Sequence, residues 1–151
     1  MAYSRTDATA FVIDPERPGQ VVTELPAFEG KGEWFAASSW SRDGGKLAGF
    51  ISLPAASAGI AIYDFGAGKF TRYAAAAGYQ PQFLPDGRVV YTVNSEIMLL
   101  DPKSGKSSRI ADVKPFALGP KLAVSPDGRK IYASLAPTES DIWMVEFDAK
   151  K

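Results

Sequence analysis

An Asp-Gly pair recurs three times along this chain of 151 residues, at an almost constant interval. The repeated segments are SSWSRDGGKLAGFIS from Ser38, PQFLPDGRVVYTVN from Pro81 and KLAVSPDGRKIYASL from Lys121. Each contains an apolar run, the Asp-Gly pair, a basic residue and a second apolar run. The glycines are Gly44, Gly87 and Gly128, so the pairs stand 43 and 41 residues apart. Such a regular interval indicates an array of similar structural units.

The Asp-Gly pair is a strong signal for a β-hairpin. Glycine adopts positive φ at little steric cost, and an aspartate carboxylate accepts N–H groups of its own turn. Pro85 and Pro126 stand before two of the aspartates and preset φ for the turn. The runs after the turns, KLAGFISL, RVVYTVN and KIYASLA, have the composition and length of strands. We therefore interpret the aspartates as turn caps, and not as a catalytic set: Asp43, Asp86 and Asp127.

A second motif follows two of these hairpins and also stands near the start of the chain. It consists of an apolar run, an aspartate, a few turn residues, a glycine and a polar restart. Its aspartates are Asp14, Asp64 and Asp101, and its glycines are Gly19, Gly68 and Gly105. This motif predicts a third strand, a tight turn and an outer fourth strand. A final MVEFDAKK repeats the third strand alone.

Strands fill the chain, so the sequence predicts an all-β fold. Repeats of about 40–45 residues with four strands are typical of β-propeller blades. We predict a partial blade at 1–29, blades at 30–76 and 77–114, and a partial blade at 115–151. Ala74–Ala77 is too short for a stable helix and is predicted to be a turn. Propellers close rings of about four to eight blades. The expectation is a β-propeller segment of about three four-stranded antiparallel blades, half of a six- or seven-bladed ring.

The composition excludes several functional classes. Without cysteine or histidine the chain lacks thiolates, the commonest general base and the commonest transition-metal ligand. Its 17 basic residues are balanced by 17 acidic ones, which leaves no cationic excess for nucleic acid or anionic lipid. No G-x-S-x-G elbow, dense calcium loop or membrane-spanning apolar run is present. Glycoside hydrolysis by two carboxylates stays open, although no pair is singled out. We expect no enzymatic activity, cofactor, metal, nucleic-acid partner or membrane insertion.

The repeats resemble the WD-like blades of the TolB-like propeller superfamily, in which S-P-D-G closes the first hairpin of each blade. VSPDG from Val124 matches fully, FLPDG from Phe83 matches nearly, and WSRDG from Trp40 has arginine in place of proline. The ending KIYASLAPTESDIWMVEF is similar to the last blade of propellers appended to bacterial receptor-type serine/threonine kinases. The resemblance implies the fold. It does not imply one function, because such blades serve as periplasmic scaffolds, kinase sensor regions and peptidase caps.

The aromatic residues divide into two groups. Those inside predicted strands are expected in the core between blades: Trp40, Phe50, Phe83, Tyr91, Tyr132 and Trp143. Trp34, Phe35, Tyr79 and Phe116 lie in or next to segments that connect one blade to the next. In a propeller these connections gather on one face with the turns between second and third strands, and such loops carry binding residues. The candidate contact residues are Glu33, Trp34, Tyr79, Gln80, Asn94 and Glu96. The alternative is a solvated loop surface with partly buried aromatics.

The leading functional hypothesis is a non-catalytic scaffold or sensor module that binds a protein or peptide on its channel face. One alternative is the accessory propeller of a multidomain peptidase or kinase. Another is a truncated or engineered propeller fragment without independent activity. An unclosed stack would expose strand edges, which favours a homodimer that completes the ring. The compartment stays open: a TolB-like parent implies a periplasmic or other extracytoplasmic site, while no signal peptide is visible.

Overall fold

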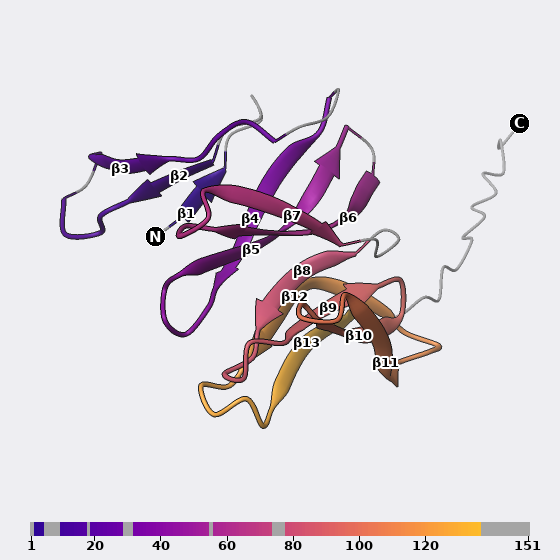
Figure 1. Ribbon diagram of the computed structural model, residues 1–151. Helices are drawn as coiled ribbons and strands as arrows, with labels where there is room; N and C mark the ends of the chain where they lie inside the picture. Colours follow the sequence, from indigo (N-terminus) through magenta and orange to yellow (C-terminus); the bar gives the residue numbers. More distant parts are fainter. Residues whose placement is uncertain are drawn as a thin grey trace, which may run out of the picture.

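The computed structural model describes residues 2–4, 10–17, 19–28, 32–54, 56–73 and 78–136. In these ranges the chain forms thirteen strands and no helix, which confirms the predicted all-β fold (Figure 1). The first seven strands are β1 (Ala2–Ser4), β2 (Ala10–Ile13), β3 (Val21–Glu24), β4 (Trp34–Trp40), β5 (Lys46–Leu53), β6 (Ala56–Asp64) and β7 (Lys69–Tyr73). The other six are β8 (Tyr79–Phe83), β9 (Val89–Val93), β10 (Glu96–Asp101), β11 (Lys106–Asp112), β12 (Ala117–Val124) and β13 (Ile131–Ala136).

The strands form four antiparallel sheets, and each sheet contains only strands that are consecutive in the chain. The sheets are β1-β2-β3, β4-β5-β6-β7, β8-β9-β10-β11 and β12-β13. Two complete four-stranded units thus lie between two shorter ones, as expected for consecutive propeller blades. The third strand predicted for the last unit, in MVEFD, lies outside the described residues, as does the turn predicted at 74–77.

The Asp-Gly turns have the predicted geometry. Their glycines have positive φ: 71° at Gly44, 86° at Gly87 and 71° at Gly128. In each turn the aspartate carboxylate accepts the backbone N–H two residues further on, which belongs to Gly45, Arg88 or Arg129, each at 3.0 Å. The prediction that these aspartates cap their own turns is therefore confirmed.

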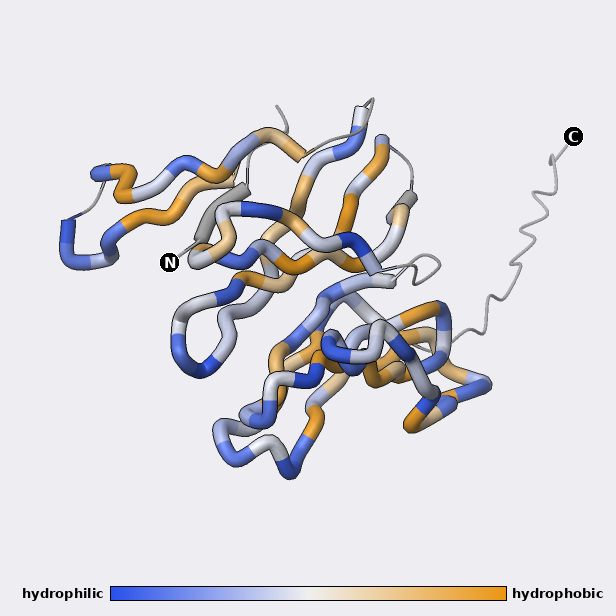
Figure 2. The backbone as a smooth tube through the Cα atoms, viewed as in Figure 1, coloured by the Kyte–Doolittle hydropathy of each residue, from blue (hydrophilic) through white to orange (hydrophobic). Residues whose placement is uncertain are grey.

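Two apolar clusters hold the first three sheets together, and β5 contributes to both because its side chains alternate between its faces. Leu47 and Ile51 belong to the first cluster, together with Ala10 and Leu25 from the β2-β3 region. Ala48 belongs to the second cluster, with buried residues of β6, β9 and β10: Ile60, Ile62, Val89, Tyr91 and Leu100. Figure 2 shows hydrophobic stretches along these strands and hydrophilic turns at their ends. The core thus lies between successive sheets, as in stacked blades.

The first strands of the last three sheets lie side by side. β8 packs against β4 on one side and β12 on the other. The Ser39 hydroxyl links β4 to β8, because it donates to the Pro81 carbonyl at 2.9 Å and accepts the Phe83 N–H at 3.0 Å. These three strands form the inner wall of the stack.

Most of the predicted core aromatics are in the core, with one exception. Tyr91 is 1% exposed, and Trp40, Phe50 and Phe83 pack against the two clusters. The prediction for Tyr132 is wrong, because this side chain is 58% exposed on β13. Its sheet has two described strands, and no further described sheet covers it. Trp143 lies outside the described residues.

Candidate functional site

The predicted contact residues lie at the same end of their sheets. Trp34 begins β4 and pairs with Ser52 near the end of β5. Tyr79 begins β8 and pairs with Thr92 near the end of β9, while Gln80 follows it in β8. This end, where first and third strands begin and second strands end, is also where the chain passes from one sheet to the next.

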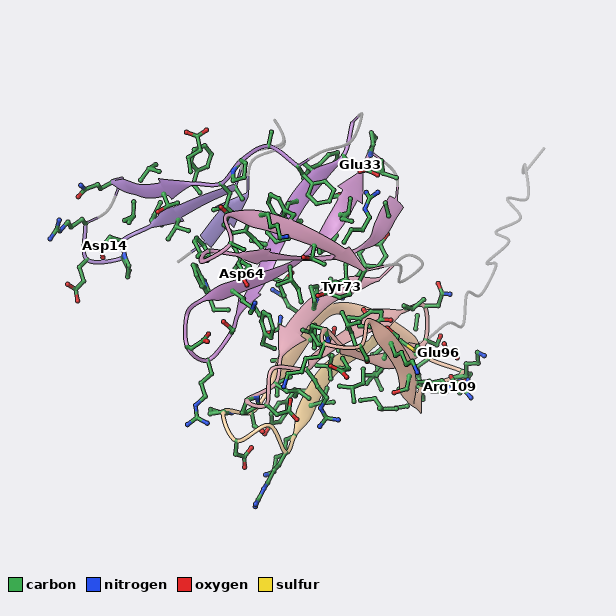
Figure 3. All side chains as sticks on the ribbon, viewed as in Figure 1. Asp14, Glu33, Asp64, Tyr73, Glu96 and Arg109 are labelled. Carbon is green, nitrogen blue, oxygen red and sulfur yellow. The ribbon has the colours of Figure 1, made fainter. Side chains whose placement is uncertain are left out.

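We name this end the connector face and define it by Glu33, Trp34, Tyr79, Gln80, Asn94 and Glu96. Asn94 belongs to the two-residue turn between β9 and β10, and Glu96 begins β10. The opposite end is the turn face, defined by Asp43, Asp64, Asp86, Asp101 and Asp127. Figure 3 shows Glu33 and Glu96 on the upper and right-hand side of the molecule, away from Asp14 and Asp64 on the left.

The two glutamates of the connector face are engaged within their own sheets. Glu33 forms an ion pair with Arg72 of β7. Glu96 accepts a hydrogen bond from the Arg109 guanidinium of β11 at 2.7 Å, and Figure 3 shows the two side by side. Exposed pairs of this kind contribute about 1 kcal/mol or less to stability. Their main consequence is that neither glutamate offers an unpaired charge to a ligand.

Tyr79 is the more exposed of the two aromatic side chains of this face, since Trp34 is half-buried, and hydrogen bonds and packing hold the backbone beside Tyr79 in place. Its side chain is 38% exposed, and its ring packs on Phe50 of the preceding sheet with centroids 5.5 Å apart. The Gly78 carbonyl accepts a hydrogen bond from the buried Ser57 hydroxyl at 2.6 Å. A Cβ at Gly78 would come within 2.9 Å of Ile60 and Tyr91, so the chain here is packed closely against the core.

Gln80 and Asn94 have an unfavourable backbone conformation. Their φ angles are 52° and 53°, and they are the non-glycine residues with positive φ in the described part of the chain. Gln80 lies in a register irregularity of β8, between Tyr79 and Gln82. Its Oε1 is also the buried side-chain polar atom that has no hydrogen-bond partner among the described residues. An unpaired buried acceptor costs about 1–3 kcal/mol, so this position is locally destabilised.

The aspartate carboxylates of the turn face accept hydrogen bonds from residues of their own blades. The Ser41 hydroxyl, which donates to Asp43 at 2.6 Å, lowers the pKa of this carboxyl, as does the Gly45 N–H. Hydrogen bonds likewise lower the pKa of Asp64, Asp86, Asp101 and Asp127, where the main donors are Lys46, Arg88, Ser104 and Ser125. All five carboxylates are therefore ionised at neutral pH and bonded within their own blade.

The turn face also contains a hollow of about 570 Å³ between the second and third sheets, which we name the inter-blade hollow. This hollow was not predicted from the sequence. Ile62 and Phe83 contribute apolar lining, and Tyr73 bridges the two sheets by donating its hydroxyl to the Pro102 carbonyl at 3.3 Å. Burial raises the pKa of the Tyr73 phenol, which keeps this donor protonated. The lining residues come from two repeats, and no local motif marks such a combination.

Neither a group of metal-ligating side chains nor a membrane-spanning helix is found in the ranges that the structure describes. No group of three His, Cys, Asp or Glu side chains in those ranges could hold a metal ion. Over the same ranges there is no helix of the length and apolarity needed to cross a membrane.

Comparison with known proteins bears on the fold. No protein-family model matches the sequence, and no curated protein matches it. Many solved structures are similar, among them the following two. The putative TolB of Agrobacterium tumefaciens superimposes with a TM-score of 0.62 at 20% identity, over 88% of this chain and 52% of that one. The β-propeller domain of Cps50 (Swd1) from Myceliophteria thermophila gives 0.61 at 20% identity, over 89% and 45%.

The chain thus spans about half the length of the structures it matches. At this level of identity the likeness concerns the fold alone. The order of the sheets, the capped Asp-Gly turns and these two superpositions agree, and the predicted resemblance is confirmed for the fold: the chain has the fold of part of a β-propeller, similar to these TolB and WD40-type propellers.

Proposed function

We propose that this chain is a non-catalytic propeller module that binds a polypeptide segment at its connector face. The observation that carries the proposal is the pair Tyr79-Gln80 at the start of β8. There a partly exposed aromatic ring stands beside a residue with positive φ and an unpaired buried oxygen. Strain of this kind persists only where the surrounding structure enforces it, and it concentrates at binding sites.

A polypeptide fits this surface better than a small polar molecule does. Tyrosine and tryptophan supply large contact areas at low entropic cost, and they are enriched at the centres of protein interfaces. Trp34 and Tyr79 begin the first strands of two successive sheets, and β4 and β8 pack against each other. Because Glu33 and Glu96 are already in ion pairs, the contact would rest chiefly on these two aromatic side chains.

The proposal is tested by an unbiased selection of peptide ligands. A phage-displayed library of random linear peptides is panned on the full chain, and enriched peptides are measured by calorimetry. We expect Tyr79→Ala and Trp34→Ala each to weaken binding about tenfold or more, the cost of truncating a central interface aromatic.

Tyr132→Ala is the matched control, because this tyrosine is also exposed but lies on β13, away from the connector face. It should leave the affinity within about twofold, the usual result for a residue outside an interface. Peptides that bind the Tyr79→Ala and Trp34→Ala variants as tightly as the wild type would show that the connector face is not the binding surface.

A further inference from the structure

One of the three Asp-Gly turns has an arginine where the other two have a proline, and this arginine lines a second hollow. Arg42 stands where the other Asp-Gly turns have Pro85 and Pro126. All three residues line one hollow of about 600 Å³. Most of its other walls come from the ends of β4, β8 and β12, including Trp40 and Phe83. The hollow therefore lies on the inner wall formed by β4, β8 and β12, at the turn face, and we name it the inner hollow.

Arg42 is the charged residue among those that line this hollow. No carboxylate of the described residues lies within ion-pair distance of its guanidinium, whereas Arg88, in the next Asp-Gly turn, pairs with Asp86 at 2.7 Å. Asp43 does not neutralise it, because the Asp43 carboxylate is bonded inside its turn and lines the inter-blade hollow instead. The inner hollow thus presents one unpaired positive charge.

The rest of the lining is chiefly apolar. Trp40, Phe83, Leu84, Pro85, Val124 and Pro126 provide this surface. The Ser39 hydroxyl is used between β4 and β8, and the Ser125 hydroxyl donates to Asp127 at 2.5 Å. Ser38 and Gln82 also line the hollow, and in the described part of the chain their side chains have no hydrogen-bond partner. A ligand would meet one guanidinium, two available polar groups and apolar walls.

We propose that the inner hollow binds a polypeptide carboxylate that is flanked by apolar groups. The Arg42 guanidinium would hold the carboxylate through two parallel hydrogen bonds, its preferred geometry. Trp40, Phe83 and Leu84 would pack against apolar groups next to that carboxylate. One unpaired cation matches a carboxylate with a single charge better than a phosphate ester, which carries about −1.5 to −2 at neutral pH. The site lies at the turn face and does not depend on the connector-face proposal.

The test is a titration followed by ¹H–¹⁵N NMR of the full chain. The probes are N-acetyl-Leu-Leu with a free carboxylate, the same dipeptide as its C-terminal amide, and acetate. The Trp40 indole N–H is the reporter, because this side chain lines the hollow. We expect saturable shifts with the acid, and binding about tenfold weaker for the amide, since a hydrogen bond to a charged group is lost. Acetate should bind about as weakly as the amide, because it lacks the apolar body.

Arg42→Pro is the decisive variant, because it installs the residue that two equivalent turns already contain. It should weaken binding of the acid about tenfold while the rest of the spectrum is retained. Arg42→Gln should do the same if the proline disturbs the turn. Arg88→Gln, a turn cation at the inter-blade hollow, should leave the affinity unchanged.

Three results would overturn the proposal. The first is equal binding of the acid and the amide, or no saturable shift of Trp40 with either. The second is wild-type affinity in both Arg42 variants. The third is acetate binding as tightly as the dipeptide acid, which would make the hollow a simple anion site.

Discussion

The residues at which the chain turns differ between the two ends of the sheets. On the turn face every Asp-Gly turn places glycine at positive φ and closes the turn with an aspartate carboxylate. On the connector face Gly32 and Gly59 also have positive φ, but so do two residues that are not glycine, Gln80 and Asn94, and the Gln80 Oε1 is buried without a partner among the described residues. The Asp-Gly turns of the turn face thus use residues that suit their conformation, whereas the connector face includes two residues that do not.

Because of this difference, substitutions at the two ends should have opposite effects on stability. Substitutions on the turn face should mainly destabilise the protein, because they remove favourable local interactions. Substitutions that relieve strain on the connector face should stabilise it, and on our proposal they should weaken peptide binding, as in other stability–activity trade-offs.

The largest effect is expected from Gly128→Ala. A Cβ at this position would lie 2.6 Å from Cδ of Pro85 in the neighbouring turn, and φ is 71°. We expect a loss of about 3 kcal/mol, the sum of backbone strain and steric overlap. Gly44→Ala is the control, with the same φ but no atom within 4 Å of its Cβ. It should cost about 1–2 kcal/mol. Urea unfolding measures both, and equal losses would mean that the two turns do not touch in solution.

The sequence predicted the turn face well because its signals are local. Gly44, Gly87 and Gly128 and the aspartates before them specify their hairpins within a few residues, whatever lies around them. The burial of Tyr132 was predicted wrongly because it depends on which sheet covers β13, and that is not a local property. The two hollows were not predicted because their walls combine residues from two or three repeats.

The connector face was predicted in position but not in detail. Its six residues follow from where blades connect, so their common location could be inferred from the repeat. The ion pairs of Glu33 and Glu96 join residues 39 and 13 positions apart. The positive φ of Gln80 could not be foreseen, because glutamine seldom adopts this conformation and no turn motif surrounds it.

A smaller effect, of opposite sign, is expected from Gln80→Gly. This change removes both the backbone strain and the unpaired Oε1, and it offsets part of the gain through the greater freedom of glycine in the unfolded chain. We expect unfolding to require about 1 kcal/mol more than in the wild type. Gln80→Leu keeps the strain and removes only the Oε1, so it should stabilise less. If Gln80→Gly lowered the urea midpoint, the strain argument for this site would be wrong.

A smaller gain is expected from Asn94→Gly. Asn94 has nearly the same φ as Gln80, but asparagine tolerates this region better than most residues, so less strain is available to release. The predicted stabilisation is about 0.5 kcal/mol or less. Chemical denaturation of Asn94→Gly beside Gln80→Gly checks this order, and a larger gain at Asn94 would contradict it.

The smallest effect per residue is the loss of stability expected when the turn-face carboxylates are protonated in acid. The pKa of Asp43, Asp86 and Asp127 is lowered in the folded protein from its usual value of 3.8, chiefly by side-chain hydrogen bonds. Their contribution to stability is therefore complete above this value and is lost as the pH falls through the lower folded values. We expect the urea midpoint to change little between about pH 7 and 5 and to decline below about pH 4.

The triple variant Asp43→Asn, Asp86→Asn and Asp127→Asn isolates this contribution, because asparagine still accepts hydrogen bonds but does not titrate in this range. It should be less stable than the wild type at neutral pH and should lose less stability between about pH 4 and 2. An equally steep acid decline in the triple variant would place the titrating groups elsewhere. Since these three carboxylates are exposed and screened by solvent, each change is expected to be modest. The turn face would then owe its stability mainly to glycine geometry, which Gly44→Ala measures, and less to the charge of its caps.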